Sequence, residues 1–181
     1  TKSLPDFPVA WYMMGCAYEA IGEDGDAMKA LDTSIKVGHR FAQPYIKKGD
    51  ILQRRGDKTG ALDNLDKGLR VNPLSEDALI KRAGLLSDIG KFDKALNDYN
   101  VLIRMDSSNA NALIEKARIL NRFDKAQEEL ETWERVITLN PENTGAFIGQ
   151  ARALKRLGKV DEAKGSILKA VQLDIKNDED L

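Results

Sequence analysis

A spacing of 34 residues recurs along the chain and constrains its fold more than any other feature. Gly15 and Gly49 lie 34 residues apart, and Gly22, Gly56 and Gly90 follow one another at the same step. Two series of large residues keep this step through all five copies. The first series is Trp11, Tyr45, Leu79, Leu113 and Phe147, and the second is Leu31, Leu65, Tyr99, Trp133 and Ile167. Agreement of this kind, with no insertion or deletion, indicates tandem copies of one structural unit.

Small residues occupy two further positions of the repeat, which predicts a close contact between two segments. One series is Gly15, Gly49, Ala83, Ala117 and Ala151, and the other is Ala27, Ala61, Ala95 and, two periods later, Ala163. Together the series place the units at residues 8–41, 42–75, 76–109, 110–143 and 144–177. A short tail, 178–181, follows within a single domain that spans residues 1–181.

Each unit is predicted to form two helices, and the second unit illustrates the pattern. Pro44 falls in the first turn of the first helix, where its missing N–H costs little, and Gly56 ends that helix as a C-cap. The apolar stripe of the second helix is formed by Ala61, Leu62, Leu65 and Leu69. No segment alternates apolar and polar residues, so no strand is expected. A hairpin this short cannot bury its apolar face alone, so neighbouring units must stack and share one core.

The chain resembles the tetratricopeptide repeat family over residues 8–177. In the first unit the resemblance is carried by Trp11, Gly15, Tyr18, Gly22 and Ala27. It implies an all-α, right-handed superhelical α-solenoid of five antiparallel helix-turn-helix repeats, whose concave face binds peptides. Pentatricopeptide repeats, which bind RNA, have a longer period, and the constant step of 34 argues against them.

The fourth unit departs from the repeat at two positions. Asp124 replaces the turn glycine, and Glu129 replaces the alanine of the helix contact. Aspartate tolerates left-handed backbone, but a carboxylate at a helix contact must be solvated, paired or displaced. We expect a local distortion there, and an early start of the second helix would let Ala126, one turn earlier, take over the contact. Sequence drift is the preferred explanation over a functional switch.

The composition provides no catalytic or metal-binding group. His39 and Cys16 are the single histidine and the single cysteine, which excludes an internal disulfide and a metal cluster of the usual spacing. The glycine-containing segment 54–60 lacks the spacing of a phosphate-binding loop. The chain is therefore not expected to be an enzyme, and no cofactor is expected.

The overall charge also limits the partners. Lys+Arg 28 against Asp+Glu 29 gives a formal net charge of -1, which favours neither nucleic acid nor membrane as a partner. The apolar runs are too short to span a bilayer, and we expect a cytoplasmic protein.

The first helices are expected to line the concave face, and one position on them is apolar in every unit. Its residues are Tyr12, Ile46, Ile80, Ile114 and Ile148. Two explanations remain open. The row is a hydrophobic track for a ligand, or its members pack against the next hairpin.

Basic residues gather on the same face in the last two units. They are Arg118, Arg122, Arg152, Lys155 and Arg156. Because guanidinium groups bind carboxylates in bidentate geometry, we predict that this half of the groove binds an acidic peptide segment or a C-terminal carboxylate. Family members that hold chaperone tails use lysine and asparagine clamps. This chain has Tyr12, Cys16, Ile46 and Asp50 at the corresponding positions, which disfavours that ligand.

Three functional hypotheses follow. The leading one is a non-catalytic scaffold that binds a protein or peptide. The second is a homo-oligomer assembled through the solenoid ends, because Val160, Ile167 and Val171 leave apolar surface uncovered on the last helix. The third, RNA binding, ranks last because no aromatic residues interleave with the arginines.

Overall fold

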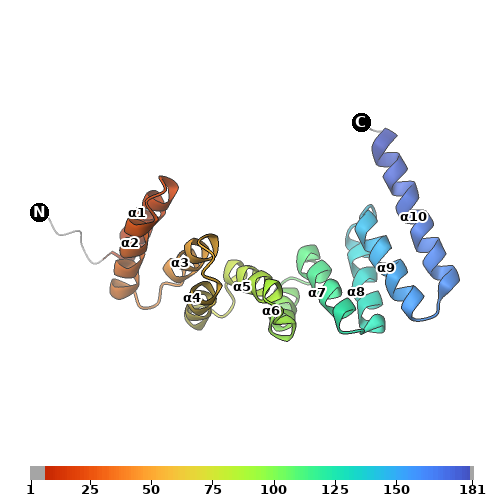
Figure 1. Ribbon diagram of the computed structural model, residues 1–181, viewed down its shortest axis with the longest axis horizontal. Coiled ribbons are helices and arrows are strands. Elements are labelled where there is room, and N and C mark those ends of the chain that lie inside the picture. The colour runs from red at the N-terminus through yellow and green to blue at the C-terminus, as the bar shows by residue number, and fades with distance from the viewer. Residues whose placement is uncertain (1–6, 180–181) are drawn as a thin grey trace, which may run out of the picture. The chain divides into compact units, whose positions relative to one another are not determined.

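Helices alone make up the part of the chain that the structure describes. The computed structural model describes residues 7–179, with side chains through residue 176, and these residues form ten helices and no strand (Figure 1). The helices are α1 (Pro8–Ala20), α2 (Asp24–Val37), α3 (Gln43–Arg54), α4 (Lys58–Val71), α5 (Glu76–Asp88), α6 (Phe92–Met105), α7 (Ala110–Arg122), α8 (Ala126–Leu139), α9 (Thr144–Arg156) and α10 (Val160–Glu179). The predicted all-α fold is confirmed.

The 34-residue spacing of the sequence reappears in the helix boundaries. The second helices of the hairpins begin 34 residues apart, at Asp24, Lys58, Phe92, Ala126 and Val160. The first helices end at the same step, at Ala20, Arg54, Asp88, Arg122 and Arg156. The repeat therefore determines where helices begin and end as well as which residues they bury.

The turn inside each hairpin depends on left-handed backbone. Gly22, Gly56, Gly90 and Gly158 have φ values between 76° and 82°, which a glycine adopts without steric cost. Asp124 occupies the same position in the fourth hairpin with φ 56°. Aspartate is one of the few residues that tolerate this conformation, so the fourth turn keeps the geometry of the others.

The small residues allow the two helices of a hairpin to approach closely. A Cβ atom on Gly15 would lie 2.8 Å from Cγ of Leu31, and one on Gly49 would lie 3.1 Å from Cγ of Leu65. Both leucines are buried, at 0 % and 1 % exposure. The glycines therefore provide the space that the large residues of the second helix fill.

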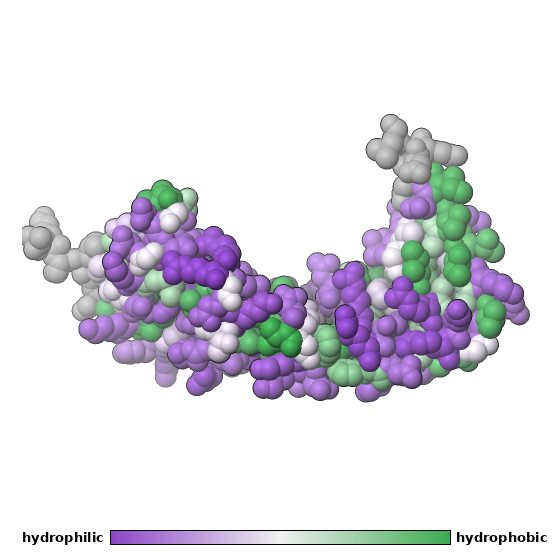
Figure 2. Space-filling model, viewed as in Figure 1, coloured by the Kyte–Doolittle hydropathy of each residue, from purple (hydrophilic) through white to green (hydrophobic). Residues whose placement is uncertain are grey.

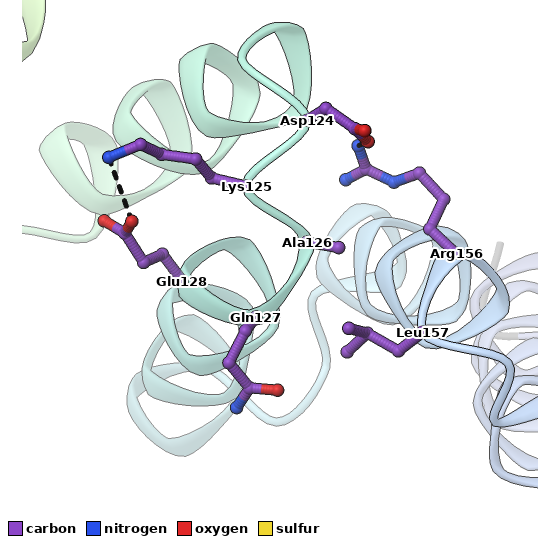
Figure 3. A pocket seen from close by; sticks show the side chains of 7 residues that line it. All are labelled: Asp124, Lys125, Ala126, Gln127, Glu128, Arg156 and Leu157. Carbon is purple, nitrogen blue, oxygen red and sulfur yellow. Dashed lines mark hydrogen bonds and ion pairs between the residues drawn. The ribbon is translucent and has the colours of Figure 1, made fainter.

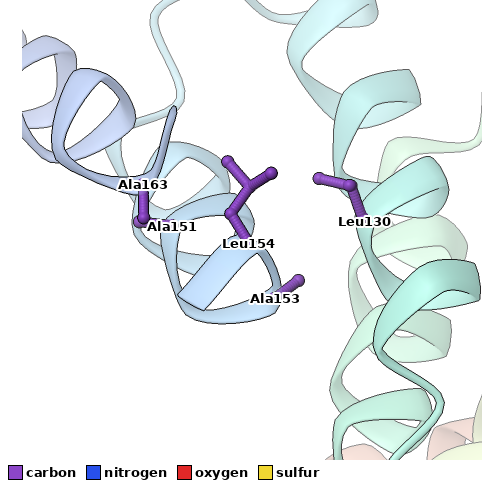
Figure 4. Close-up of a cluster of buried hydrophobic side chains, with 5 residues drawn as sticks. All are labelled: Leu130, Ala151, Ala153, Leu154 and Ala163. Atoms are coloured by element: carbon purple, nitrogen blue, oxygen red, sulfur yellow. The ribbon is translucent and has the colours of Figure 1, made fainter. Parts of the chain in front are cut away.

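The chain divides into two compact units, residues 1–95 and 96–181. In the first unit, Ala27 and Leu31 of α2 and Ile51 of α3 form one buried cluster. In the second unit, Leu130 of α8 packs with Ala153 and Leu154 of α9 and with two further alanines (Figure 4). Consecutive hairpins thus complete one another's cores, as the sequence predicted.

Polar contacts between consecutive hairpins recur with the same period, and we call them the inter-hairpin ladder. Each rung joins a second helix to the first helix of the next hairpin, 16 residues further along the chain. The rungs are Asp32 with Lys48, Asp66 with Arg82 (2.6 Å) and Asn100 with Lys116 (2.9 Å). Because these groups lie at the margin of an apolar contact, they favour one alignment of each pair of helices over its alternatives.

The fourth hairpin shows no early helix start, and the expected distortion is wrong. Helix α8 begins at Ala126, one period after α6 and one before α10. Glu129 stays in the helix contact and is buried, with 1 % exposure. It is accommodated because three side chains donate to it or pair with it, as described below.

The last helix is longer than the corresponding helices and carries an exposed apolar face. Helix α10 contains 20 residues, whereas α8 contains 14, so it passes the predicted end of the fifth unit at residue 177. The last two residues of the predicted tail, 180–181, lie outside the described residues. Hydrophobic side chains follow the outer side of α10 (Figure 2). They are Val160, Ile167, Leu168, Val171 and Ile175, each at least 50 % exposed.

Candidate functional site

A pocket of about 330 Å³ lies among α7, α8 and α9, within the second unit. We call it the arginine pocket. It brings together four of the ten predicted groove residues, Ile114 and Arg118 of α7 and Ile148 and Arg152 of α9. The other residues that line it are Trp133, Asn143, Gly145 and Gly149.

The polar rim of the arginine pocket is positively charged. The side chain of Arg118 is 64 % exposed and forms an ion pair with Glu115 on its own helix, at 2.6 Å. Arg152 is exposed and makes no hydrogen bond or ion pair with any other residue that the structure describes. Asn143 caps α9 by accepting a hydrogen bond from the Ala146 N–H at 2.9 Å, so the positive end of a helix dipole adds to the two guanidinium charges.

The rest of the arginine pocket is apolar. Ile148 is 47 % exposed, Ile114 is half-buried, and Trp133 is buried, with 6 % exposure. The indole ring lies directly against the backbone of α9, since a Cβ atom on Gly149 would be only 2.2 Å from a ring carbon. Gly149 is therefore the residue that allows Trp133 to reach the next hairpin and form a wall of the pocket.

Trp133 is fixed by the buried carboxylate of Glu129, which lies one turn before it on α8. The indole Nε1–H donates to Glu129 Oε1 at 3.2 Å, and the Asn121 amide donates to the same oxygen at 3.1 Å. Arg156 Nη2 forms an ion pair with Glu129 Oε2. The carboxylate is thus satisfied by α7, α8 and α9 together, which explains how a charge is tolerated at this helix contact.

Arg156 was predicted to face a ligand, but its guanidinium contacts the fourth hairpin. Besides Glu129, its guanidinium binds the Asn121 carbonyl and the Asp124 carboxylate, each at 3.2 Å. Figure 3 shows Arg156 directed at Asp124 in a second pocket, of about 410 Å³, beside the α7–α8 turn. Arg156 is therefore engaged in holding α9 to the fourth hairpin, and it is not a residue of the arginine pocket.

The remaining predicted groove residues do not share one environment. Ile46 is buried, with 4 % exposure. Of the two explanations, packing within the protein therefore holds for this residue, and not the hydrophobic track for a ligand. Tyr12 packs edge-on against Phe41 with ring centroids 5.3 Å apart. Ile80 is 48 % exposed and belongs to the first unit. The other two, Arg122 and Lys155, are exposed and do not line the arginine pocket.

A further pocket, of about 550 Å³, lies in the first unit and is lined by Glu19, Asp50, Gln53 and Arg54. Its charges neutralise one another. Glu19 pairs with Lys47 at 2.6 Å and with Arg54 at 2.9 Å, and Asp50 pairs with Lys81 at 2.9 Å. In the arginine pocket, by contrast, the lining residues include two arginines and no acid.

Four residues of the arginine pocket were not predicted from the sequence, namely Trp133, Asn143, Gly145 and Gly149, although the sequence carries a signal for Trp133 and Gly149. Trp133 is the largest member of its series, and Gly149 occupies a position that holds Met13, Lys47, Lys81 and Glu115 in the other units. A glycine inside a helix, where the other copies have long side chains, leaves room for a large side chain to approach the backbone. The pairing of the largest and smallest residues would have linked the two helices.

Within residues 7–179, no three His, Cys, Asp or Glu side chains are grouped so that they could hold a metal ion. In the same range, no helix has both the length and the apolar character needed to cross a membrane.

Paired helices that repeat with a fixed period and share their cores define a helical-repeat protein. A family profile described as "Tetratricopeptide repeat" matches residues 46–110 and 80–144, and a second profile with the same description matches residues 8–37. The chain belongs to the tetratricopeptide repeat family. Proteins of this family serve as protein–protein interaction scaffolds, and the chain is such a scaffold.

Three solved structures, two of MamA proteins and one of YrrB, have a similar fold. A MamA structure is 18 % identical, with a TM-score of 0.82, and the match covers 95 % of this chain and 94 % of that one. MamA from Desulfovibrio magneticus RS-1 is 17 % identical, with a TM-score of 0.79 and coverage of 97 % and 99 %. YrrB, described as a TPR protein with an unusual peptide-binding site, is 15 % identical, with a TM-score of 0.81 and coverage of 93 % and 87 %. At these identities the similarity shows the fold alone. No curated protein sequence matches the chain.

Proposed function

We propose that the chain is a non-catalytic scaffold that binds an acidic peptide segment or a C-terminal carboxylate in the arginine pocket. The observation that carries this proposal is the pair of exposed guanidinium groups, Arg118 and Arg152, above an apolar floor. Their helices, α7 and α9, contact each other within the second unit. A bound carboxylate would thus meet two charged donors at once.

The energetics favour a carboxylate over a neutral ligand at this site. A hydrogen bond between charged groups stabilises a complex by about 1.5–3 kcal/mol, roughly twice the value for neutral partners. Arg152 has no internal partner to give up among the described residues, whereas Arg118 must exchange Glu115 for the ligand. Arg152 is therefore proposed as the stronger anchor. The peptide-binding site named for YrrB supports peptide recognition by a related fold.

The test is binding of a fluorescein-labelled peptide rich in glutamate, measured by fluorescence anisotropy. Reversing both charges, with Arg118→Glu and Arg152→Glu, is expected to weaken binding at least tenfold. The matched control reverses Arg70 and Arg104, which are exposed residues on α4 and α6 that do not line the pocket. Equal affinities of the two double variants would contradict the proposal, and so would equal binding of a peptide with glutamine in place of glutamate.

A second experiment removes Glu115, whose carboxylate would compete with the peptide for Arg118. The substitution Glu115→Gln removes the carboxylate that pairs with this guanidinium at 2.6 Å. The proposal expects tighter binding of the glutamate peptide, by a factor of about 2 to 5, since an exposed ion pair is worth less than about 1 kcal/mol. Weaker binding would indicate that Glu115 itself contacts the peptide.

Self-association through α10 is a second candidate function, favoured by its exposed apolar face. Val160, Ile167 and Val171 are each about half exposed, and Leu168 is 63 % exposed. Light scattering over a wide concentration range tests this candidate. A mass that rises with concentration and falls again in an Ile167→Lys variant supports it, and a constant monomer mass rejects it.

A further inference from the structure

Glu129 is the one departure in the small-residue series at which a charged side chain replaces alanine. The other four units have Ala27, Ala61, Ala95 and Ala163 at this position. All four alanines are buried, with exposures from 0 % to 6 %, and Glu129 is equally buried at 1 %. A carboxylate has therefore been placed where an alanine suffices for the fold.

The surroundings of Glu129 are adapted to it. A buried carboxylate costs several kcal/mol unless its oxygens are fully satisfied. Here one oxygen accepts from the Trp133 indole at 3.2 Å and from the Asn121 amide at 3.1 Å, and the other pairs with Arg156. The donors come from three consecutive helices, so the carboxylate sits at a junction between two hairpins.

A second departure completes the same cluster. Trp133 is larger than the residues at its position in the other units, Leu31, Leu65, Tyr99 and Ile167, and its ring fits because residue 149 is glycine. Ring carbons and nitrogen would lie 2.2 to 2.6 Å from a Cβ atom there. Independent drift at separate positions does not account for substitutions whose side chains contact one another.

This cluster positions one of the side chains that line the arginine pocket. The hydrogen bond from Nε1 to Glu129 holds the indole against α9, where its ring lines the pocket with Ile114 and Ile148. The same carboxylate pairs with Arg156, which does not line the pocket. Glu129 thus holds the indole that forms an apolar wall of the pocket.

We propose that Glu129 is a positioning residue that makes the arginine pocket selective for a carboxylate flanked by a large apolar side chain. The inference rests on the proposed peptide-binding function and names the ligand more closely. The two guanidinium groups take the carboxylate, and the wall formed by Trp133, Ile114 and Ile148 takes an aromatic or branched aliphatic side chain next to it. Apolar contact and charge recognition lie side by side in a pocket of about 330 Å³, which suits one large side chain.

The experiment compares two peptide probes, acetyl-Gly-Glu-Phe-Glu-Gly-amide and the same peptide with Ala in place of Phe. The wild-type chain is expected to bind the Phe probe about tenfold more tightly than the Ala probe. The substitution Glu129→Ala restores the residue of the other repeats, so the helical content should be unchanged. It is expected to reduce the Phe/Ala affinity ratio to below about 2, while Glu129→Gln, which keeps an acceptor for the indole, retains most of the ratio.

A fluorescence measurement reports the position of Trp133 directly. The chain has 2 tryptophans, so a Trp11→Phe background leaves Trp133 as the emitting residue. In that background, Glu129→Ala should increase acrylamide quenching of Trp133, and Glu129→Gln should not. If Glu129→Ala does not fold, Trp133→Leu tests the same wall and is expected to abolish the Phe/Ala ratio.

The outcomes separate this inference from the proposed function. A Phe/Ala ratio and a quenching constant that survive Glu129→Ala overturn the role of Glu129, even if the charge-reversal variants still lose binding. A wild-type chain that binds the glutamate peptide but does not discriminate Phe from Ala overturns the apolar wall alone. Failure of the wild-type chain to bind any acidic probe overturns both proposals.

Discussion

The substitution of glycine by alanine is expected to change the stability of the fold in opposite directions at two positions six residues apart. Gly84 lies inside helix α5, and Gly90 lies in the turn after it. A Cβ atom at either position would have no neighbour within 4 Å, so packing makes no contribution to the difference. The two variants therefore isolate the conformational preference of the backbone.

The magnitudes follow from the local geometry. In a helix interior alanine is more favourable than glycine by about 0.8–1.0 kcal/mol, so Gly84→Ala should stabilise the fold by about 1 kcal/mol. Gly90 has φ +76, where an alanine costs about 1–2 kcal/mol, partly offset by about 0.4–1 kcal/mol from a more restricted unfolded chain. Gly90→Ala should therefore destabilise the fold by about 1 kcal/mol.

Thermal unfolding followed by far-ultraviolet circular dichroism measures the difference. For a chain of this length, 1 kcal/mol shifts Tm by about 2–4 °C, so the two variants should melt about 4–8 °C apart on either side of the wild type. A double variant, Gly84→Ala with Gly90→Ala, serves as the control and should melt near the wild type. Shifts of the same sign for the two single variants would refute the reasoning, because an ordinary helix interior and a left-handed turn cannot both respond alike.

Two further predictions concern the packing and titration of individual residues. Gly149→Ala should destabilise the fold by about 1–3 kcal/mol in urea unfolding, because its Cβ atom would overlap the Trp133 ring, whereas Gly165→Ala in α10, with nothing within 4 Å, should be neutral or stabilising. Burial, aided by a hydrogen bond with a neighbouring thiol, raises the pKa of Tyr12 from 10.0 to about 12. The contribution of Tyr12 to stability should be fully present below pH 10.0 and be lost as the pH rises towards about 12. Ultraviolet titration should show a late phenolate signal that Tyr12→Phe removes.

The sequence predicted most of the fold because the fold is periodic. The series of Gly15 and Leu31 identified the contact inside each hairpin, and the turn glycines identified the helix ends, since each position is repeated several times. A single copy of such a pattern would be ambiguous, but five copies at one spacing are not. The helix boundaries follow the same step.

The site was only partly predictable, because it is made of departures from the repeat. Arg118 and Arg152 could be placed on one face from their spacing alone. The engagement of Arg156 by Glu129 depends on a contact between hairpins that no spacing rule specifies. Ile46 was placed in the row on the concave face because it shares one position of the repeat with its four counterparts, yet it is buried, with 4 % exposure. Periodicity predicts what the units share, whereas recognition depends on what distinguishes them.

The inter-hairpin ladder has a consequence for how such a chain can change in length. The carboxylate of Asp32 meets a lysine, and that of Asp66 meets an arginine at the equivalent place one period later. Deleting residues 42–75 as a block would bring Asp32 opposite Arg82, and an acid would again face a base. A deletion of only part of a period, between Asp32 and Lys48, would instead move Lys48 out of register with Asp32. Shortening or lengthening by complete hairpins is therefore the change that this protein can accept without a mismatched charge at the new junction.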